Sequence, residues 1–196
     1  MRADARRNYE RLLDAARAAF TEHGVDAPLD DIARRAGVGA GTLYRHFPTR
    51  DALIEAVYRG DVEELCALAY RLLETSPPAD ALADWMRAQV VHVQHKRGLG
   101  NALVAAVGHD SELFAWCRQR LWDASGALLA AARTTGAVRG DVEAADLLRL
   151  GHGVAIATER VPQDAQRLLT VVLDGLGVAP LTADGAAAAA GHEGDR

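Results

Sequence analysis

Histidine and cysteine side chains that can bind metal gather in the middle of the chain. His92 and His95 form an H-x-x-H pair, and an i, i+3 pair can share one face of a helix. His109 or Cys66 could add further ligands. Three consecutive ligands at a diagnostic spacing are absent from the sequence, so solvated or singly hydrogen-bonded histidines account better for the pattern. We therefore expect no metal site.

The other reactive residue types form no enzyme-like pattern. Cys66 and Cys117 are the two cysteines of the chain, and they lie far apart inside apolar stretches. This spacing excludes a disulfide framework and a CxxC motif, and it fits a reducing compartment. We find no nucleophile–base signature, no glycine loop for phosphate and no paired carboxylates in a cleft-forming pattern. An enzyme that uses an internal cavity stays the alternative, but the sequence favours a binding protein without a cofactor.

The charge is distributed unevenly along the chain. In total, 22 Lys and Arg face 27 Asp and Glu, which argues at first against nucleic acid, because cationic side chains carry DNA binding. Residues 1–60 hold ten basic and nine acidic residues, which leaves twelve against eighteen for residues 61–196. A DNA-facing surface must therefore lie in the N-terminal part. No apolar run approaches the ~20 residues of a membrane span, and the N-terminus is charged, so we expect a cytoplasmic protein without membrane contact.

The hydrophobic pattern predicts an all-α protein. Ala, Leu and Val supply much of the 49% apolar share, and Ala and Leu are strong helix formers. A first helix runs from Arg6 to His23 and a short second one from Pro28 to Ala36, each ended by a glycine. A third, very short helix covers residues 40–46 before Pro48. Thr49 is expected to cap a long fourth helix that reaches residues 76–78.

Beyond this break the pattern predicts a separate helical region. The tail at residues 177–196 has nothing to pack, and we expect it to be disordered. The expected C-terminal helices cover about residues 79–97, 99–108, 111–134, 141–159 and 163–176.

Two short helices joined by a glycine-containing turn are the geometry of a helix-turn-helix, in which the second helix enters the major groove. Residues 29–36 and 40–46 fit this geometry. The segment 29–53 also closely resembles the N-terminal domain of TetR-type (tetracycline-repressor-like) regulators. The resemblance covers roughly residues 6–58 and is carried by Ile32-Ala33, Ala36-Gly37-Val38, Gly41-Thr42-Leu43-Tyr44 and His46-Phe47. It implies a DNA-binding domain at 1–58 and an effector-binding and dimerisation domain at 59–176.

The resemblance also implies roles for single residues in the DNA interface. Arg45 is expected to be the main base reader, because a guanidinium can pair bidentately with guanine, and Arg6 supports it from a flexible basic arm. Tyr44 and Phe47 have an alternative as core aromatics, and for Phe47 we expect the core. The residues expected at base edges are Ala40, Gly41, Thr42 and Arg45, and those expected near phosphates are Tyr44, His46 and Arg50.

Three positions depart from the family pattern. Gly39 stands where many members carry a capping Ser, Pro28 where a Thr often begins the second helix, and Asp30 where a basic or neutral residue is common. Two phosphate-binding hydroxyls are thereby lost, and Asp30 should repel the DNA backbone. We expect compensation from the arm with Arg2, Arg6 and Arg7 and from Arg50. Arg34 and Arg35 are expected to be solvated.

The middle of the chain combines aromatic and apolar residues with a few polar ones, a mixture typical of a ligand pocket. The resemblance places the effector pocket of the family in this region, although packing in the core explains most of these residues better. The expected pocket residues are Trp85, Met86, Gln89, His92, Val93, Leu103, Val107, Phe114 and Trp122.

The last two helices carry more apolar surface than one small domain readily covers. Two such helices from each subunit would form a four-helix dimer interface, an arrangement that the resemblance also implies. Burial within one subunit is the alternative. The expected interface residues are Leu147, Leu150, Gly151, Val154, Leu168, Leu169, Val172 and Leu173.

Together these features predict a sequence-specific transcriptional regulator. We expect a homodimeric repressor that a small-molecule effector releases from an inverted-repeat operator. An architectural DNA-binding protein without effector is a further alternative, which a tightly packed region at 79–134 would favour.

Overall fold

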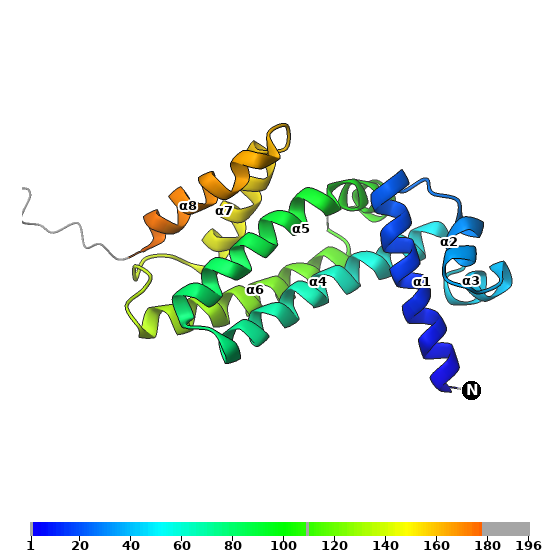
Figure 1. The fold of residues 1–196 in the computed structure, drawn as a ribbon, viewed down its shortest axis with the longest axis horizontal. Coiled ribbons are helices and arrows are strands. Elements are labelled where there is room, and N and C mark those ends of the chain that lie inside the picture. The colour runs from blue at the N-terminus through cyan, green and yellow to red at the C-terminus, as the bar shows by residue number, and fades with distance from the viewer. Residues whose placement is uncertain (1, 109, 178–196) are drawn as a thin grey trace, which may run out of the picture.

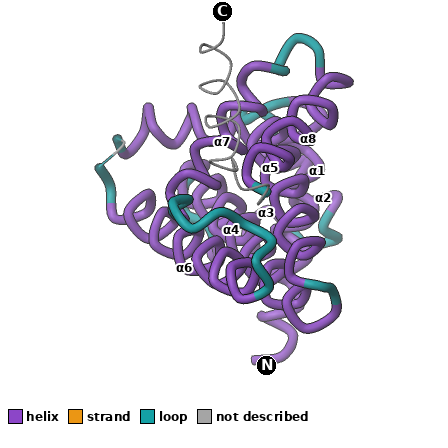
Figure 2. The backbone as a smooth tube through the Cα atoms, turned by 90° about the vertical axis from the view of Figure 1, so that its left-hand side faces the viewer, coloured by secondary structure: helices purple, strands orange, loops and turns teal. Residues whose placement is uncertain are grey.

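The computed structural model describes residues 2–108 and 110–177, and within these ranges all regular secondary structure is helical (Figure 2). The predicted all-α class is confirmed. Residues 178–196, which make up nearly all of the predicted tail, lie outside the described residues, as does His109. The elements are α1 (Arg2–His23), α2 (Leu29–Arg35), α3 (Ala40–His46), α4 (Arg50–Thr75), α5 (Pro78–Val107), α6 (Glu112–Thr134), α7 (Ala144–Ala157), the 3-10 turn η1 (Pro162–Asp164) and α8 (Ala165–Leu176).

Helices α1, α2 and α3 gather at one end of an elongated molecule, together with the start of α4 (Figure 1). Gly24 follows the end of α1, and Gly37 lies in the turn between α2 and α3. Their φ values of 75° and 67° favour glycine. Apolar side chains of all four helices fill the space between them. Leu12, Ile32 and Leu43 are fully buried there.

The predicted arm at the N-terminus is wrong in its conformation. The arm with Arg2, Arg6 and Arg7 is expected to be flexible, but α1 begins at Arg2 and includes all three residues. Side-chain pairs along the helix support this first turn and a half, since Arg7 bonds Asp4 and the Arg6 Nε lies 2.9 Å from Glu10 Oε1. Acidic Asp4 near the helix start also interacts favourably with the helix dipole.

Helix α4 connects the two ends of the molecule (Figure 1). The Thr49 side chain accepts a hydrogen bond of 3.1 Å from the Ala52 N–H, so this N-cap is as predicted. From there α4 runs for 26 residues and ends before Ser76, where predicted. Its first half packs on the N-terminal helices, and its second half packs between α5 and α6.

The predicted division between residues 97 and 99 is wrong, because α5 is one continuous helix of 30 residues. Gly98, the residue between the two predicted helices, lies within α5, where it is exposed. A glycine inside a helix costs about 1 kcal/mol relative to alanine. Leu99 and Leu103, which are 4% and 1% exposed, offset this cost by burying their side chains.

Helices α7 and α8 are shorter than predicted and lie beside α5 (Figure 1). A capping box begins α7, in which the Glu143 N–H donates to the Asp146 carboxylate at 2.9 Å. The segment before it is held by Arg133, whose guanidinium donates to the carbonyls of Gly140 and Val142. Residues 162–164 form a 3-10 turn ahead of α8.

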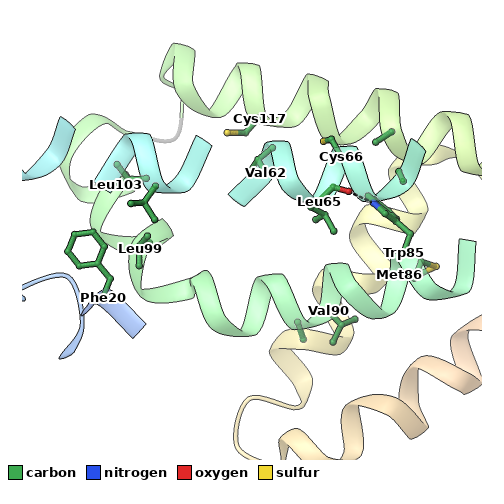
Figure 3. Packing of buried hydrophobic residues seen from close by; sticks show 14 of the residues in the cluster. Phe20, Val62, Leu65, Cys66, Trp85, Met86, Val90, Leu99, Leu103 and Cys117 are labelled. Atoms are coloured by element: carbon green, nitrogen blue, oxygen red, sulfur yellow. Dashed lines mark hydrogen bonds between the residues drawn. The ribbon is translucent and has the colours of Figure 1, made fainter. Parts of the chain in front are cut away.

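One hydrophobic core extends through both ends of the molecule (Figure 3). Trp85 is its largest fully buried side chain, and its indole N–H donates to the Leu65 carbonyl at 2.9 Å. Met86 lies next to it, and Leu103 is buried in the same core. Among the described residues, no helix is long and apolar enough to cross a membrane.

Candidate nucleic-acid interface and effector cavity

Helices α2 and α3 form a helix-turn-helix whose turn is held by the backbone. Gly37 allows the chain to reverse, and the Val38 N–H then donates to the Ala33 carbonyl at 3.0 Å. Ile32 and Ala33 of α2 and Leu43 of α3 are buried, so the two helices are fixed on the core. The opposite face of α3 is left toward solvent.

This exposed face of α3 carries most of the residues predicted to contact DNA. Ala40, Gly41, Tyr44 and Arg45 are exposed, and Tyr44 is 47% accessible despite its large ring. Among the described residues no carboxylate pairs with Arg45, so its guanidinium is not neutralised by a neighbour. The face therefore offers a cation and a phenol beside a small-residue surface that permits close approach.

The remaining two residues of the predicted α3 set are less accessible. Thr42 and His46 are half-buried. The His46 ring packs edge-on against Tyr9 of α1 at 5.9 Å between ring centroids, and Tyr9 also lies 5.3 Å from the buried Phe47. Phe47 is a core residue, as predicted. The contact of Tyr9 with α3 was not predicted, although an aromatic residue on the exposed side of the first helix is visible in the sequence.

Arg50 is partly engaged by the backbone, and its expected contact with phosphate stays a prediction. Its Nη1 donates to the carbonyls of Val25 and Ala27 at 2.8 and 2.6 Å. These carbonyls belong to the α1–α2 loop, and no pattern in the sequence connects this loop with the start of α4. Arg50 thus fixes the loop that leads into the helix-turn-helix.

The other cations near this interface are more exposed. Arg6 pairs with Glu10 on the surface with 82% of its side chain accessible, so the pair is weak and phosphate can compete for it. Arg34 and Arg35 pair with Asp31 and Glu22, each at 2.7 Å, which agrees with the expectation of solvated arginines.

Two adjoining cavities lie between α4, α5, α6 and α7. Their volumes are about 370 and 410 Å³, within the range of small-molecule sites. Tyr58, His92, Val93 and His152 line both of them. Burial lowers the pKa of His92 and raises that of Tyr58 to about 12, so both are neutral at pH 7 and able to take part in neutral hydrogen bonds.

The structure divides the predicted pocket residues into two groups. His92, Val93 and Phe114 line the first cavity, and Gln89 and Trp122 line the second together with His92 and Val93. The other four line neither cavity: Trp85, Met86 and Leu103 are packed in the core, and Val107 is 43% exposed near the end of α5.

The predicted interface residues on α7 and α8 are divided in a similar way. Leu150 is exposed, and Leu168, Val172 and Leu173 are partly so. The remaining predicted residues Leu147, Gly151, Val154 and Leu169 are buried within the subunit.

Gly151 is buried because α7 packs closely on α5 at this position. A Cβ atom at this position would overlap the Gln89 side chain of α5, whose Cδ would be only 2.8 Å away. The missing side chain therefore permits packing of α7 on α5 in the same chain. Gly153 of the same helix has open space around it. On α8, Val171 is 62% exposed, and it was not among the predicted interface residues because leucines dominate the apolar pattern of this helix.

A buried ion network connects three helices and was not predicted. Asp61 of α4 is 4% exposed, with Arg17 Nε of α1 at 2.7 Å and Lys96 Nζ of α5 at 2.8 Å. Arg17 also pairs with Glu64 at 2.9 Å. As for metal ligands, the described residues bring no three His, Cys, Asp or Glu side chains together.

Comparison with known proteins agrees with this architecture. Residues 12–57 match the family described as bacterial regulatory proteins, tetR family, and residues 77–178 match the C-terminal domain of SbtR-like transcriptional regulators. Among curated proteins, the HTH-type transcriptional regulator UidR of Escherichia coli is 31% identical over 108 residues, or 55% of this chain. The match spans about half (53%) of that relative's length.

Solved structures match over more of the chain. The TetR transcriptional regulator SCO0520 from Streptomyces coelicolor is 42% identical, with 87% of this chain and 98% of that chain covered and a TM-score of 0.75. A TetR transcription regulatory protein from Mycobacterium vanbaalenii is 39% identical over 90% of this chain and 99% of its own, with a TM-score of 0.74. With its helix-turn-helix at α2 and α3 and a helical second half, the chain belongs to the TetR family of bacterial transcriptional regulators.

Proposed function

We propose that the protein is a homodimeric repressor that a small molecule releases from an inverted-repeat operator. The observation that carries this proposal is the exposed face of α3, where Arg45 and Tyr44 project beside Ala40 and Gly41. Arg45 reads a base edge in the major groove, and Tyr44 binds a phosphate. Because few other side chains on α3 can make direct contacts, DNA shape contributes to the sequence preference.

The proposed dimer is formed by the outer faces of α7 and α8. Leu150, Ile156 and Val171 are 37%, 38% and 62% exposed, and Gly153 between them leaves room for a helix of a second subunit. A two-fold axis through this four-helix contact presents two copies of α3 to successive major grooves, about 34 Å apart. The operator is then an inverted repeat.

The effector occupies the cavities lined by Tyr58 and His92. Their presence favours a ligand-gated regulator over an architectural DNA-binding protein without effector. Tyr58 belongs to α4, and Arg50 at the start of the same helix holds the α1–α2 loop. A shift of α4 on ligand binding therefore moves the helix-turn-helix. Near-complete release requires the effector to bind the DNA-free state about 10⁴-fold more tightly.

The DNA-binding part of the proposal is tested by selection from a random pool of short duplexes at one stated salt concentration. We expect an inverted repeat to be enriched. Arg45→Ala should relax the preference at one base position by about 1–3 kcal/mol, and Tyr44→Phe should weaken all duplexes similarly. Arg34→Ala, which removes an exposed charge already paired with Asp31, is the matched control and should keep the preference. If no duplex is enriched, the proposed function fails.

The dimer is tested by light scattering during gel filtration. Val171→Glu should give monomers that bind the selected operator poorly, because it buries a charge in the proposed interface. Val91 is a similarly exposed valine (49%) on α5 that lines a groove with residues of α1 and α4, so Val91→Glu should remain dimeric. A Val171→Glu protein that stays dimeric would contradict the proposed interface.

A further inference from the structure

The charged residues that line the two cavities are all basic. The basic residues Lys96, Arg118 and Arg149 line them, whereas no Asp or Glu is among their described lining residues. The domain around the cavities is acidic, with twelve basic and eighteen acidic residues at positions 61–196. A positive cavity within an acidic domain is complementary to an anionic ligand.

Lys96 stands out among these cations. It is the only lysine in the sequence; all the other 21 basic residues are arginines. It lines the first cavity, and 13% of its side chain is exposed. An ammonium carries three donors that can point in different directions, so it can hold Asp61 on one side and accept a second anion on the other.

Apolar side chains form a large part of the wall of the first cavity. Val104, Phe114 and Ile156 line it, and Asn101 and His152 add polar atoms. A cavity of about 370 Å³ with one ammonium and apolar walls fits a molecule with a short hydrocarbon body and one anionic end.

We propose that the effector is an amphipathic carboxylic acid whose carboxylate binds Lys96 in competition with Asp61. This inference rests on the proposed function, whose effector site it specifies. Asp61 also holds Arg17 of α1, at 2.7 Å. When the carboxylate of the acid binds the Lys96 ammonium, Lys96 neutralises Asp61 less completely. Arg17, which also pairs with Asp61, transmits this change to the first helix of the DNA-binding end.

The ligand class is tested with acids of increasing length, from butyrate to decanoate, and with 3-phenylpropionate. Each acid is compared with its primary amide and its primary amine by isothermal titration of the purified full chain. We expect at least one acid to bind about tenfold or more tightly than both neutral and cationic analogues, since hydrogen bonds between charged groups are the stronger ones. A panel in which no acid is preferred over its amide overturns the proposal.

The role of Lys96 is tested by variants that act in opposite directions. Lys96→Met should weaken the best acid about tenfold or more and leave the amide unchanged, whereas Asp61→Asn should strengthen the acid because the competing carboxylate is gone. Arg87→Met is the matched control: Arg87 lies on the same helix, pairs with Asp84 at 2.5 Å and lines neither cavity. Acid affinity that is unchanged in both Lys96→Met and Asp61→Asn overturns the proposal; if only one variant folds, unchanged affinity in that variant overturns it.

Reductive methylation provides a readout without DNA. Lys96 and the terminal amino group are the only amines of the chain, so peptide mapping follows the modification of this one side chain. The bound acid should slow methylation of Lys96 relative to the terminal amine, and the amide should not. If the acid protects Lys96 but does not release the selected operator, the proposed repressor mechanism fails while this site stands. If the operator is bound and the acid gives no protection, this inference fails alone.

Discussion

Replacing Gly151 by alanine tests whether this glycine serves packing within the subunit. The new Cβ would overlap the end of the Gln89 side chain, and its distance to Gln89 Cδ would be 2.8 Å. Gln89 is 4% exposed and lines the second cavity, so its amide can give way only into that space, and its Nε2 donates to the Leu148 carbonyl at 3.1 Å. Either this hydrogen bond breaks or α7 moves away from α5.

The magnitude follows from three contributions to the free energy of unfolding. Overpacking of a core by one methyl group costs about 1–3 kcal/mol. Loss of the hydrogen bond from Gln89 costs about 1 kcal/mol more. The higher helix propensity of alanine returns about 1 kcal/mol. We therefore expect Gly151→Ala to destabilise the protein by about 1–3 kcal/mol.

The assay is urea unfolding followed by circular dichroism at one fixed protein concentration, because dimerisation contributes to apparent stability. Gly98→Ala is the control: the position is an exposed helical glycine with open space around it, so this change should be neutral or stabilising by up to about 1 kcal/mol. Adding Gln89→Ala to Gly151→Ala should remove most of the clash, giving a coupling energy of about 1 kcal/mol or more. The reasoning is refuted if Gly151→Ala is as stable as Gly98→Ala.

Three further predictions concern Arg50, the cysteines and His92. Arg50→Ala should lower the free energy of unfolding by about 1–3 kcal/mol, because two loop carbonyls lose their donor; an unchanged stability with a salt dependence of DNA binding reduced by about one charge would instead indicate a phosphate contact. Burial raises the pKa of both Cys66 and Cys117 to about 11, so iodoacetamide at about pH 8 should modify them only after unfolding, and rapid reaction of the native protein would contradict this packing. Burial lowers the pKa of His92, so the unfolded chain takes up a proton first as the pH falls below 6.5; stability should then decrease with acidification, and less steeply in His92→Gln, when unfolding is measured at about pH 7.5 and about pH 5.5.

The short elements of the helix-turn-helix could be predicted from the sequence because their boundaries depend on local chemistry. Gly37 follows the end of α2, and Pro48 follows the end of α3. Each of these short helices has small or polar residues on one side, and Thr49 caps the next helix with its own side chain. Phe47 could be assigned to the core because it lies where the third and fourth helices must pack against each other. Such signals need no knowledge of distant segments.

The incorrect and missed features depend on distant segments. Gly98 is a local helix breaker, and only the burial of Leu99 and Leu103 against other helices outweighs it. The partners of Arg50 are backbone carbonyls, which leave no pattern in the sequence.

The same holds for the cavities and for the ion network. Which of the aromatic residues line a cavity depends on the volume left after packing, so Trp85 could not be separated from Trp122 by residue type. The buried network joins Asp61 to Arg17, which lies 44 positions earlier in the chain, and to Lys96, which lies 35 positions later. The single lysine was a visible signal, but the sequence could not connect it with Asp61.

Helix α4 has a consequence for how the protein folds. Leu53 and Val57 in its first half and Val62 and Ala69 in its second half are all fully buried in one continuous core. The DNA-binding end cannot melt without exposing part of the core that the cavity end shares, and the reverse is equally true. Heating should therefore produce one cooperative transition with a heat capacity change that reflects the whole chain. A fragment cut at residue 58 would lose half of this helix, and with it the surface on which its partner helices are formed.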